Sequence, residues 1–386
     1  ITGTAMQLLL RKQTEHPPRV RSRVPEVSED LDELVAQLLD PAPSRRPTLL
    51  EARRRLGLSS SRPGTSPSPE PPFLGREREL DALRSVWADV RRTTPERQGA
   101  FRAALVEGES GVGKSSLVDA FTRELAEAGA HVLQGRCYER ETVPYKAFDG
   151  VVDALSTLLR KLDPRTVEAC LPARVGLLPL VFPVLGQVPS IALAPPPPIE
   201  GLDVLQLRDR ALVALRELLV ELARRESIVL VVDDVQWSDE ESLRVLDELA
   251  FVAPTPALML IATVRPIDRE CPPSVARALR RLVAREGNLH VSLRGLADDD
   301  ARGLVERLLQ LGEGAGLDVD EITAEAQGHP LFLAELVRHV QRSMLRGRRT
   351  RVDLDEALRE RVLDLPSALR ELLSTVCLAT RPLPRE

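Results

Sequence analysis

Residues 108–115 have the sequence Gly-Glu-Ser-Gly-Val-Gly-Lys-Ser, a complete match to the phosphate-loop pattern GxxxxGK[ST]. The loop follows an apolar run at 103–106 and precedes residues 116–128, whose apolar side chains recur at helical spacing. It is therefore predicted to stand at a turn from a strand into a helix, which is the setting that the pattern requires. An ordinary glycine-rich turn is the weaker alternative. This feature favours an α/β fold in which helices cover a parallel sheet.

The residues of this loop predict a nucleoside triphosphate as the ligand. The glycines let successive backbone N–H groups converge on the phosphates, and the following helix directs its positive end at the same anion. Lys114 would reach the β and γ phosphates, and the Ser115 hydroxyl would bind Mg²⁺. The predicted nucleotide contacts are Gly108, Glu109, Ser110, Gly111, Val112, Gly113, Lys114, Ser115 and Ser116.

A second segment, residues 228–234, supplies the acidic groups that such a site needs. Its apolar run is typical of a buried parallel strand and ends in Asp233 and Asp234. Asp233 would face the loop and hold Mg²⁺ through Ser115 or a water, and Asp234 would orient the attacking water. Taken alone, two aspartates after a strand more often indicate a turn or a helix N-cap. The phosphate loop makes the catalytic interpretation the preferred one.

Strand and helix patterns alternate from residue 73 to residue 296. Helical spacing is found at 77–91, 116–128, 147–162, 205–224 and 240–251, and strand patterns at 103–106, 131–135, 228–233, 257–264 and 290–293. This alternation predicts a parallel sheet covered on both faces, with its ligand at the carboxyl ends of the strands. Only helical patterns follow, at 298–311, 318–327, 331–345, 354–363 and 367–379, and they indicate an all-α lid.

The chain before residue 73 differs in kind. Residues 58–72 are rich in Ser and Pro and are typical of a semi-rigid linker. Residues 30–39 and 49–56 are predicted helices, with too few apolar positions for a stable independent fold. Because the chain begins at Ile1 and stops soon after a helical pattern, we expect it to be a piece of a longer protein.

Composition excludes several classes of function. A formal net charge of −5 and an aromatic content of 3% argue against direct nucleic-acid binding by this chain. The cysteines Cys137, Cys170, Cys271 and Cys377 form no CxxC pair, so neither a disulfide framework nor a zinc site is indicated. No apolar run is long enough to span a bilayer and no signal peptide is visible, so we expect a cytoplasmic protein without membrane contact.

Two further positions carry weaker indications. Arg265 follows the strand at 257–264 and could sense the γ-phosphate, although a surface arginine at a strand end is equally compatible. Pro330 follows Gly328 and His329 between two helical stretches, and a simple helix start is the favoured interpretation. His329 is predicted to be a solvent-facing loop residue.

Several segments, taken in order, resemble the STAND class of AAA-related signalling ATPases. They are 73–80 (FLGREREL), the phosphate loop, 135–138 (GRCY), 143–145 (VPY), 233–239 (DDVQWSD), 263–265 (TVR) and 328–331 (GHPL). The resemblance spans residues 73–386 and implies that the nucleotide is ATP. It also implies that Gly75 and Arg76 pack near the adenine and that Arg265 senses the phosphate. Pro330 of the lid would touch the base and sugar, and the tail from 354 resembles the start of a winged-helix region.

Residues 38–41 (LLDP) and 46–48 (RPT), with the helix after them, resemble the last two helices of a serine/threonine protein kinase domain. In that family the residue matching Arg46 pairs with a Glu near the activation segment. That Glu and the catalytic motifs of kinases are absent from this chain, so it cannot phosphorylate a substrate by that route. The resemblance implies an attached kinase domain and a C-terminal sensor or partner module in the intact protein.

The predicted layout is a partial kinase end at 1–57, a linker at 58–72, a P-loop ATPase domain at 73–296, a helical lid at 297–350 and a partial winged-helix region at 351–386. The leading hypothesis is a slow, Mg²⁺-dependent ATPase that exchanges ATP and ADP as a regulatory switch and could form nucleotide-dependent oligomers. The alternatives are a non-hydrolysing nucleotide-binding scaffold and an ATP-dependent transcription regulator whose DNA-binding module lies outside this chain.

Overall fold

The computed structural model describes residues 18–40, 45–56, 73–91, 101–139, 144–195, 203–253, 256–267, 271–310, 319–345 and 352–378 of the 386-residue chain. The chain divides into two compact units. One comprises Ile1–Glu70 and Pro172–Leu215, and the other comprises Pro71–Leu171 and Arg216–Glu386. The sheet and every residue of the predicted nucleotide site belong to the second unit.

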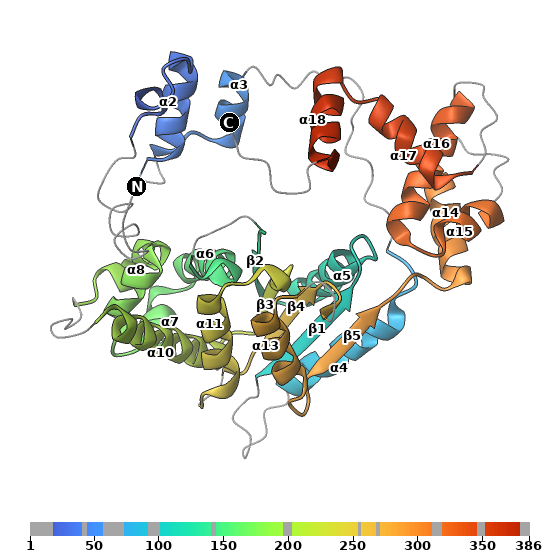
Figure 1. The fold of residues 1–386 in the computed structure, drawn as a ribbon. Helices are drawn as coiled ribbons and strands as arrows, with labels where there is room; N and C mark the ends of the chain where they lie inside the picture. The colour runs from blue at the N-terminus through green and yellow to red at the C-terminus, as the bar shows by residue number, and fades with distance from the viewer. Residues whose placement is uncertain are drawn as a thin grey trace. The chain divides into compact units, whose positions relative to one another are not determined.

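Five parallel strands form the centre of the second unit (Figure 1). In spatial order they are β2 (His131–Arg136), β3 (Ile228–Asp233), β4 (Met259–Val264), β1 (Arg102–Gly108) and β5 (Leu289–Leu293). The strands β3 and β4 are buried along almost their whole length, as strands covered on both faces must be. This confirms the predicted α/β fold of the P-loop NTPase type, with a parallel sheet flanked by helices.

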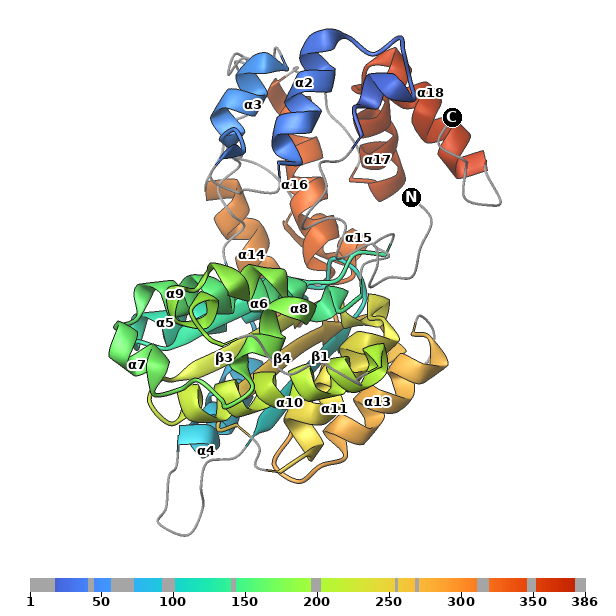
Figure 2. The same ribbon diagram turned by 90° about the vertical axis from the view of Figure 1, so that its left-hand side faces the viewer.

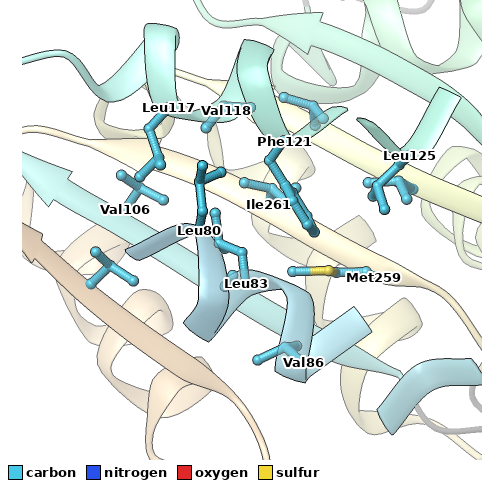
Figure 3. Close-up of a cluster of buried hydrophobic side chains, with 14 of the residues drawn as sticks. Leu80, Leu83, Val86, Val106, Leu117, Val118, Phe121, Leu125, Met259 and Ile261 are labelled. Carbon is cyan, nitrogen blue, oxygen red and sulfur yellow. The ribbon is translucent and has the colours of Figure 1, made fainter. Parts of the chain in front are cut away.

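One face of the sheet is covered by α4 (Glu77–Arg91) and α5 (Lys114–Glu127). Their apolar side chains pack against alternate strand residues, because successive residues of a strand point to opposite faces. Phe121 is fully buried in this cluster, beside Met259 and Ile261 (Figure 3). Truncating a buried phenylalanine to alanine costs about 3–5 kcal/mol. The packing therefore anchors α5, the helix that follows the phosphate loop.

The opposite face is covered by α6 (Lys146–Lys161), α11 (Glu240–Phe251) and α13 (Pro273–Val283). In Figure 2, α11 and α13 lie in front of the strands. Leu260 and Ala262 of β4 point to this side, where they line a small apolar space with residues of all three helices. The sheet is thus sealed on both faces, which leaves its carboxyl edge as the place where loops can present polar groups.

A separate helical bundle follows the last strand. It consists of α14 (Asp298–Gln310), α15 (Val319–Ala326) and α16 (Pro330–Leu345), and its own apolar core includes Val305 and Leu333. This bundle occupies the chain segment predicted as the lid. Its core shares no buried residue with the cluster between the sheet and α4 and α5.

Two more helices, α17 (Leu354–Leu363) and α18 (Ser367–Leu378), complete the described part of the second unit, which also contains the short α7 (Pro164–Glu168). Polar side chains join α17 to α16: Arg361 Nη1 lies 2.5 Å from Glu335 Oε2, and His339 Nδ1 lies 3.2 Å from Glu360 Oε2. The attachment of α17 to the bundle thus combines these polar contacts with apolar packing of Ala357.

The first unit contains only helices in its described residues. They are η1 (Val20–Ser22), α2 (Glu29–Leu38), α3 (Leu49–Arg55), η3 (Val175–Leu177), α8 (Leu178–Val181), η4 (Pro183–Gln187) and α9 (Pro189–Ala192), with the beginning of α10 (Val204–Ala223), which ends in the second unit. Arg46 donates a hydrogen bond from Nε to the Asp40 carbonyl at 2.9 Å, within the segment that resembles a kinase end. Across both units, no described helix is long and apolar enough to cross a membrane.

Two parts of the fold differ from the predicted elements. The sequence analysis predicts neither α13 nor the short helices between residues 164 and 192. In all of these helices except η3, proline stands at the first or second position, where its fixed φ angle is favourable. The same prolines suggest an irregular segment when only the sequence is considered. The predicted linker at 58–72 lies outside the described residues, so the domain limits there remain predictions.

Candidate nucleotide-binding site

The phosphate loop and the acidic pair lie at the same edge of the sheet. The loop continues from the end of β1, Asp233 is the last residue of β3, and β4 separates these two strands. All three strands run parallel, so their carboxyl ends share one edge. Neighbouring strands are about 4.8 Å apart, which places the two strand ends about 10 Å from each other. The structure therefore brings the two predicted segments together.

Glycines in left-handed backbone conformations shape the phosphate loop. Gly111 has a φ angle of 81° and Gly113 has a φ angle of 100°. Positive φ angles of this size are unfavourable for residues that have a Cβ atom. Gly113 is also the N-cap of α5 and offers no side-chain hydrogen bond to the helix. The first N–H groups of α5 thus have no side-chain cap, which fits them to an anionic phosphate.

Lys114 lies inside the curve of the loop. Its side chain is buried, and Nζ donates hydrogen bonds to the carbonyl oxygens of Gly108 at 2.8 Å and Glu109 at 2.9 Å. Ser115 and Ser116 are exposed in the first turn of α5. The ammonium group and the two hydroxyls are therefore gathered around the same turn, as the motif predicts.

Asp233 and Asp234 are held by the hydroxyl of Thr263, on the neighbouring strand β4. This hydroxyl donates a hydrogen bond to Asp233 Oδ1 and accepts one from the backbone N–H of Asp234 at 2.9 Å. Asp234 has φ 58° and ψ 43°, a left-handed conformation that costs a residue with a side chain about 1–3 kcal/mol. The contact with Thr263 thus helps to hold an unfavourable backbone that orients the second carboxylate.

Gln236 is a member of the site to which the sequence analysis assigns no role. It is fully buried, its Nε2 donates to Asp234 Oδ1 at 3.0 Å, and its Oε1 accepts from the backbone N–H of Arg265 at 3.2 Å. The amide therefore links the acidic pair to the end of β4. The only sequence signal was its place inside the segment DDVQWSD.

Arg136 is the second unassigned member. It ends β2 directly beside Asp233 in the strand register. Its Nη2 lies 2.9 Å from Asp234 Oδ2 and its Nε lies 3.7 Å from Asp233 Oδ2. The hydrogen bond with Asp234 is the largest cause that raises the pKa of the Arg136 guanidinium. A positive charge therefore faces both carboxylates, and only the pairing of β2 with β3 reveals it.

The oxygen atoms at this edge suit Mg²⁺, a hard cation that prefers oxygen ligands and keeps several waters. Ser115 offers an exposed hydroxyl, and Asp233 offers Oδ2, since its Oδ1 accepts the Thr263 hydroxyl. Within the described ranges no group of three His, Cys, Asp or Glu side chains could hold a metal alone. The donor set therefore fits a magnesium ion that shares its coordination with phosphate and water.

The lid bundle reaches the phosphate loop through His329, immediately before α16. Its Nε2 lies 3.1 Å from the Ser110 carbonyl oxygen, and its ring stacks on Phe332 with centroids 4.1 Å apart. Nδ1 is buried and has no hydrogen-bond partner among the described residues. Burial lowers the pKa of His329, an effect that the bond to Ser110 partly opposes. His329 is a loop residue, as predicted, but its side chain is half-buried because the phosphate loop and the lid pack together here. Pro330 is the first residue of α16 and is half-buried.

Arg76 packs behind the phosphate loop. It is buried, and its Nη2 donates to the carbonyl oxygens of Val112 at 3.2 Å and Arg294 at 2.5 Å. Gly75 has a φ angle of 72°, and a Cβ there would lie 2.5 Å from the Asp300 Cβ. Arg76, which is predicted to pack near the adenine, thus supports the phosphate loop through its hydrogen bond to the Val112 carbonyl.

Arg265 lies beyond the end of β4. Its Cζ lies 5.8 Å from the ring centroid of Trp237, and its backbone N–H is the group bound by Gln236. A guanidinium over an indole face is a favourable cation–π arrangement. Arg265 is therefore positioned by Trp237 and Gln236, which follow the acidic pair in the sequence.

Comparison with known proteins finds a family match over much of the sheet domain. Residues 72–261 match the family model of the AAA ATPase domain. An uncharacterized protein of Rhizobium meliloti (strain 1021) is 26% identical over 200 residues, covering 50% of this chain and 19% of the relative. The match thus spans about a fifth of the length of that curated relative. An AAA ATPase domain with this loop and acidic pair implies nucleotide binding.

Three solved structures are similar at low sequence identity. A Walker-type ATPase of Pyrococcus abyssi is 15% identical, with a TM-score of 0.43 over 79% of this chain and 76% of that chain. The Orc1 protein of Aeropyrum pernix, solved in complex with DNA, is 18% identical, with a TM-score of 0.42 over 82% and 76%. Cdc6p of Pyrobaculum aerophilum is 16% identical, with a TM-score of 0.45 over 79% and 70%.

Proposed function

We propose that this chain binds Mg·ATP at the carboxyl edge of its sheet and hydrolyses it slowly, as a regulatory switch whose lid responds to the nucleotide. Lys114 binds the β and γ phosphates, Ser115 and Asp233 hold Mg²⁺, and Asp234 orients the attacking water. Arg265 senses the γ-phosphate. The other nucleotide contacts are Gly75, Arg76, Gly108, Glu109, Ser110, Gly111, Val112, Gly113, Ser116 and Pro330.

One observation carries this proposal: the strand ends that bear the loop and the acidic pair are separated by a single strand at one sheet edge. Phosphate and metal ligands must meet around one Mg·ATP, and strand ends at one sheet edge allow this. The contact between His329 and Ser110 supports the switch, since a phosphate that moves the loop would also move the lid.

Lys114→Ala tests the proposal. The change removes a charge-assisted contact with the phosphates, and we expect the affinity for a fluorescent ATP analogue to fall about 10- to 100-fold. Lys161→Ala is the matched control, because Lys161 is an exposed residue at the end of α6. Undiminished binding by the Lys114→Ala protein would exclude this site as the nucleotide site.

A second candidate function is a nucleotide-binding scaffold without turnover. It is favoured by the contacts of Asp234, whose Oδ1 accepts a hydrogen bond from Gln236 and whose Oδ2 accepts one from Arg136, so both oxygens already take part in structural contacts. Asp234→Asn separates the two functions. In a switch the variant should retain ATP and lose hydrolysis, which a single-turnover assay with radiolabelled ATP would record. In a scaffold both measurements should match those of the unsubstituted chain.

We also propose that the chain forms part of a STAND-class signalling protein behind a serine/threonine kinase domain. The motif order within 73–331 and the two helices α2 and α3 support this, and residues 1–57, 297–350 and 351–386 keep their predicted assignments as kinase end, lid and winged-helix start. The attached kinase and a C-terminal sensor module would be its partners, and ATP could promote oligomers. A cytoplasmic location fits this role.

A further inference from the structure

The positively charged guanidinium of Arg136 faces both carboxylates of the acidic pair. The strand register places it beside Asp233, and its guanidinium contacts Asp234 at 2.9 Å. The Arg136 side chain is 56% exposed, whereas those of Asp233 and Asp234 are 13% and 19% exposed. The carboxylates are thus fixed and largely buried, and the arginine is the member of the group that is free to change position.

Three of the four carboxylate oxygens accept a hydrogen bond from a side chain. Asp233 Oδ1 accepts the Thr263 hydroxyl, Asp234 Oδ1 accepts the Gln236 amide, and Asp234 Oδ2 accepts the Arg136 guanidinium. Among the described residues, Asp233 Oδ2 has only the Arg136 Nε at 3.7 Å, which is too long for a hydrogen bond. Asp233 Oδ2 is therefore the oxygen most accessible to a metal ion, and a guanidinium lies against it.

We propose that Arg136 is a positioning residue of the magnesium site, which competes with Mg²⁺ for Asp233 and holds the Asp234 carboxylate in place. This inference rests on the proposed function. A divalent ion held by Asp233 Oδ2 would repel the guanidinium, and Arg136 would then keep its contact with Asp234 and give up the one with Asp233. The ring of Tyr138, 5.8 Å from Arg136 Cζ, offers the displaced charge an exposed aromatic face.

The competition has a measurable consequence for metal binding. Removing one positive charge beside the ion lowers the electrostatic cost of binding Mg²⁺, and solvent screening keeps the effect moderate. For Arg136→Gln we expect the Mg²⁺ concentration that gives half-maximal binding of a fluorescent ATP analogue to fall about 3- to 10-fold. A surface ion pair with no role at the site would leave this concentration unchanged.

Two further variants make the test specific. Arg281→Gln removes the same charge from a side chain that is 57% exposed and pairs with Asp247 on the surface, and it should not alter the Mg²⁺ requirement. Arg136→Lys keeps the charge but loses the fork that reaches both carboxylates, so its Mg²⁺ requirement should stay within about twofold of the unsubstituted chain. Circular dichroism of each variant verifies that the fold is retained.

The role at Asp234 has a second readout. At saturating Mg²⁺, Arg136→Gln should slow single-turnover hydrolysis, and adding Asp234→Asn should slow it no further than Asp234→Asn alone, because both changes act on one carboxylate. An unchanged or increased Mg²⁺ requirement in Arg136→Gln overturns the inference and leaves the proposed function intact. Failure of the unsubstituted chain to bind the ATP analogue with Mg²⁺ overturns the proposed function, and the inference with it.

Discussion

The phosphate loop and the acidic pair share one sheet edge, yet different kinds of bonds hold them. Glycine backbone conformations shape the loop, and its lysine bonds to carbonyl groups of the same loop. The acidic pair is held by the side chains of Arg136, Gln236 and Thr263, two of which come from neighbouring strands. One half of the site is therefore built locally, and the other half depends on how strands pair.

This difference determines which substitutions each half tolerates. A loop shaped by its own backbone should respond to changes at its glycines and little to changes on other strands. A carboxylate pair held by a buried hydroxyl and a buried amide should respond to the loss of a single polar atom, because an unpaired buried group retains its full desolvation cost. Four measurements test this contrast.

The largest expected effect is that of Thr263→Val. Valine keeps the shape but leaves Asp233 Oδ1 and the Asp234 N–H without this partner, and we expect the free energy of unfolding to fall by about 2–4 kcal/mol. Thr122→Val is the matched control, because the Thr122 hydroxyl is also buried but bonds only to a carbonyl of its own helix. Its cost should stay below about 1 kcal/mol. Equal losses in urea unfolding would show that the Thr263 network adds no stability.

Gly111→Ala comes next and is compared with Gly113→Ala. Both alanines would adopt a left-handed backbone at a cost of about 1–2 kcal/mol. A Cβ on Gly111 would also lie 2.9 Å from the Leu331 Cβ and 2.9 Å from the His329 Cε1, whereas a Cβ on Gly113 meets no atom within 4 Å. We therefore expect Gly111→Ala to lower the free energy of unfolding by about 1–2 kcal/mol more. If the two variants unfold alike, the lid does not rest on the loop.

Gln236→Leu should have a smaller effect. It removes the amide that joins Asp234 to the N–H of Arg265, and we expect a loss of about 1–2 kcal/mol in the free energy of unfolding. Gln134→Leu, at an exposed position of β2, serves as the control and should be close to neutral. A neutral Gln236→Leu would mean that Asp234 is oriented by Arg136 and Thr263 alone.

The smallest effect concerns pH. The lowered pKa of His329 means that the folded chain favours the neutral ring, so protonation opposes folding as the pH falls below the ordinary histidine value of about 6.5. His329→Asn removes this titration. Between about pH 7.5 and pH 5.5 the unsubstituted chain should therefore lose more stability in urea unfolding than His329→Asn does. Parallel losses in the two proteins would place the His329 ring in solvent.

Prediction from the sequence worked best where structure is local. The bounds of β3, α11 and α17 agree with the predicted ones, because each combines a clear apolar pattern with polar residues at its ends. It missed α13, for which no helix was predicted, and the contact of His329 with Ser110, which depends on where the lid bundle lies. A periodicity within a segment carries no information about which distant segment covers it.

The amino-acid pattern alone was enough to predict a phosphate loop between a strand and a helix, and a buried strand that ends in two aspartates. These features depend on residues within a few positions of one another. Only the tertiary structure decided which side chains hold the acidic pair, since Thr263 is 29 positions from Asp234 and Arg136 is 98 positions away. Strand order and register bring such partners together, and both follow from the packing of the whole sheet rather than from any local pattern.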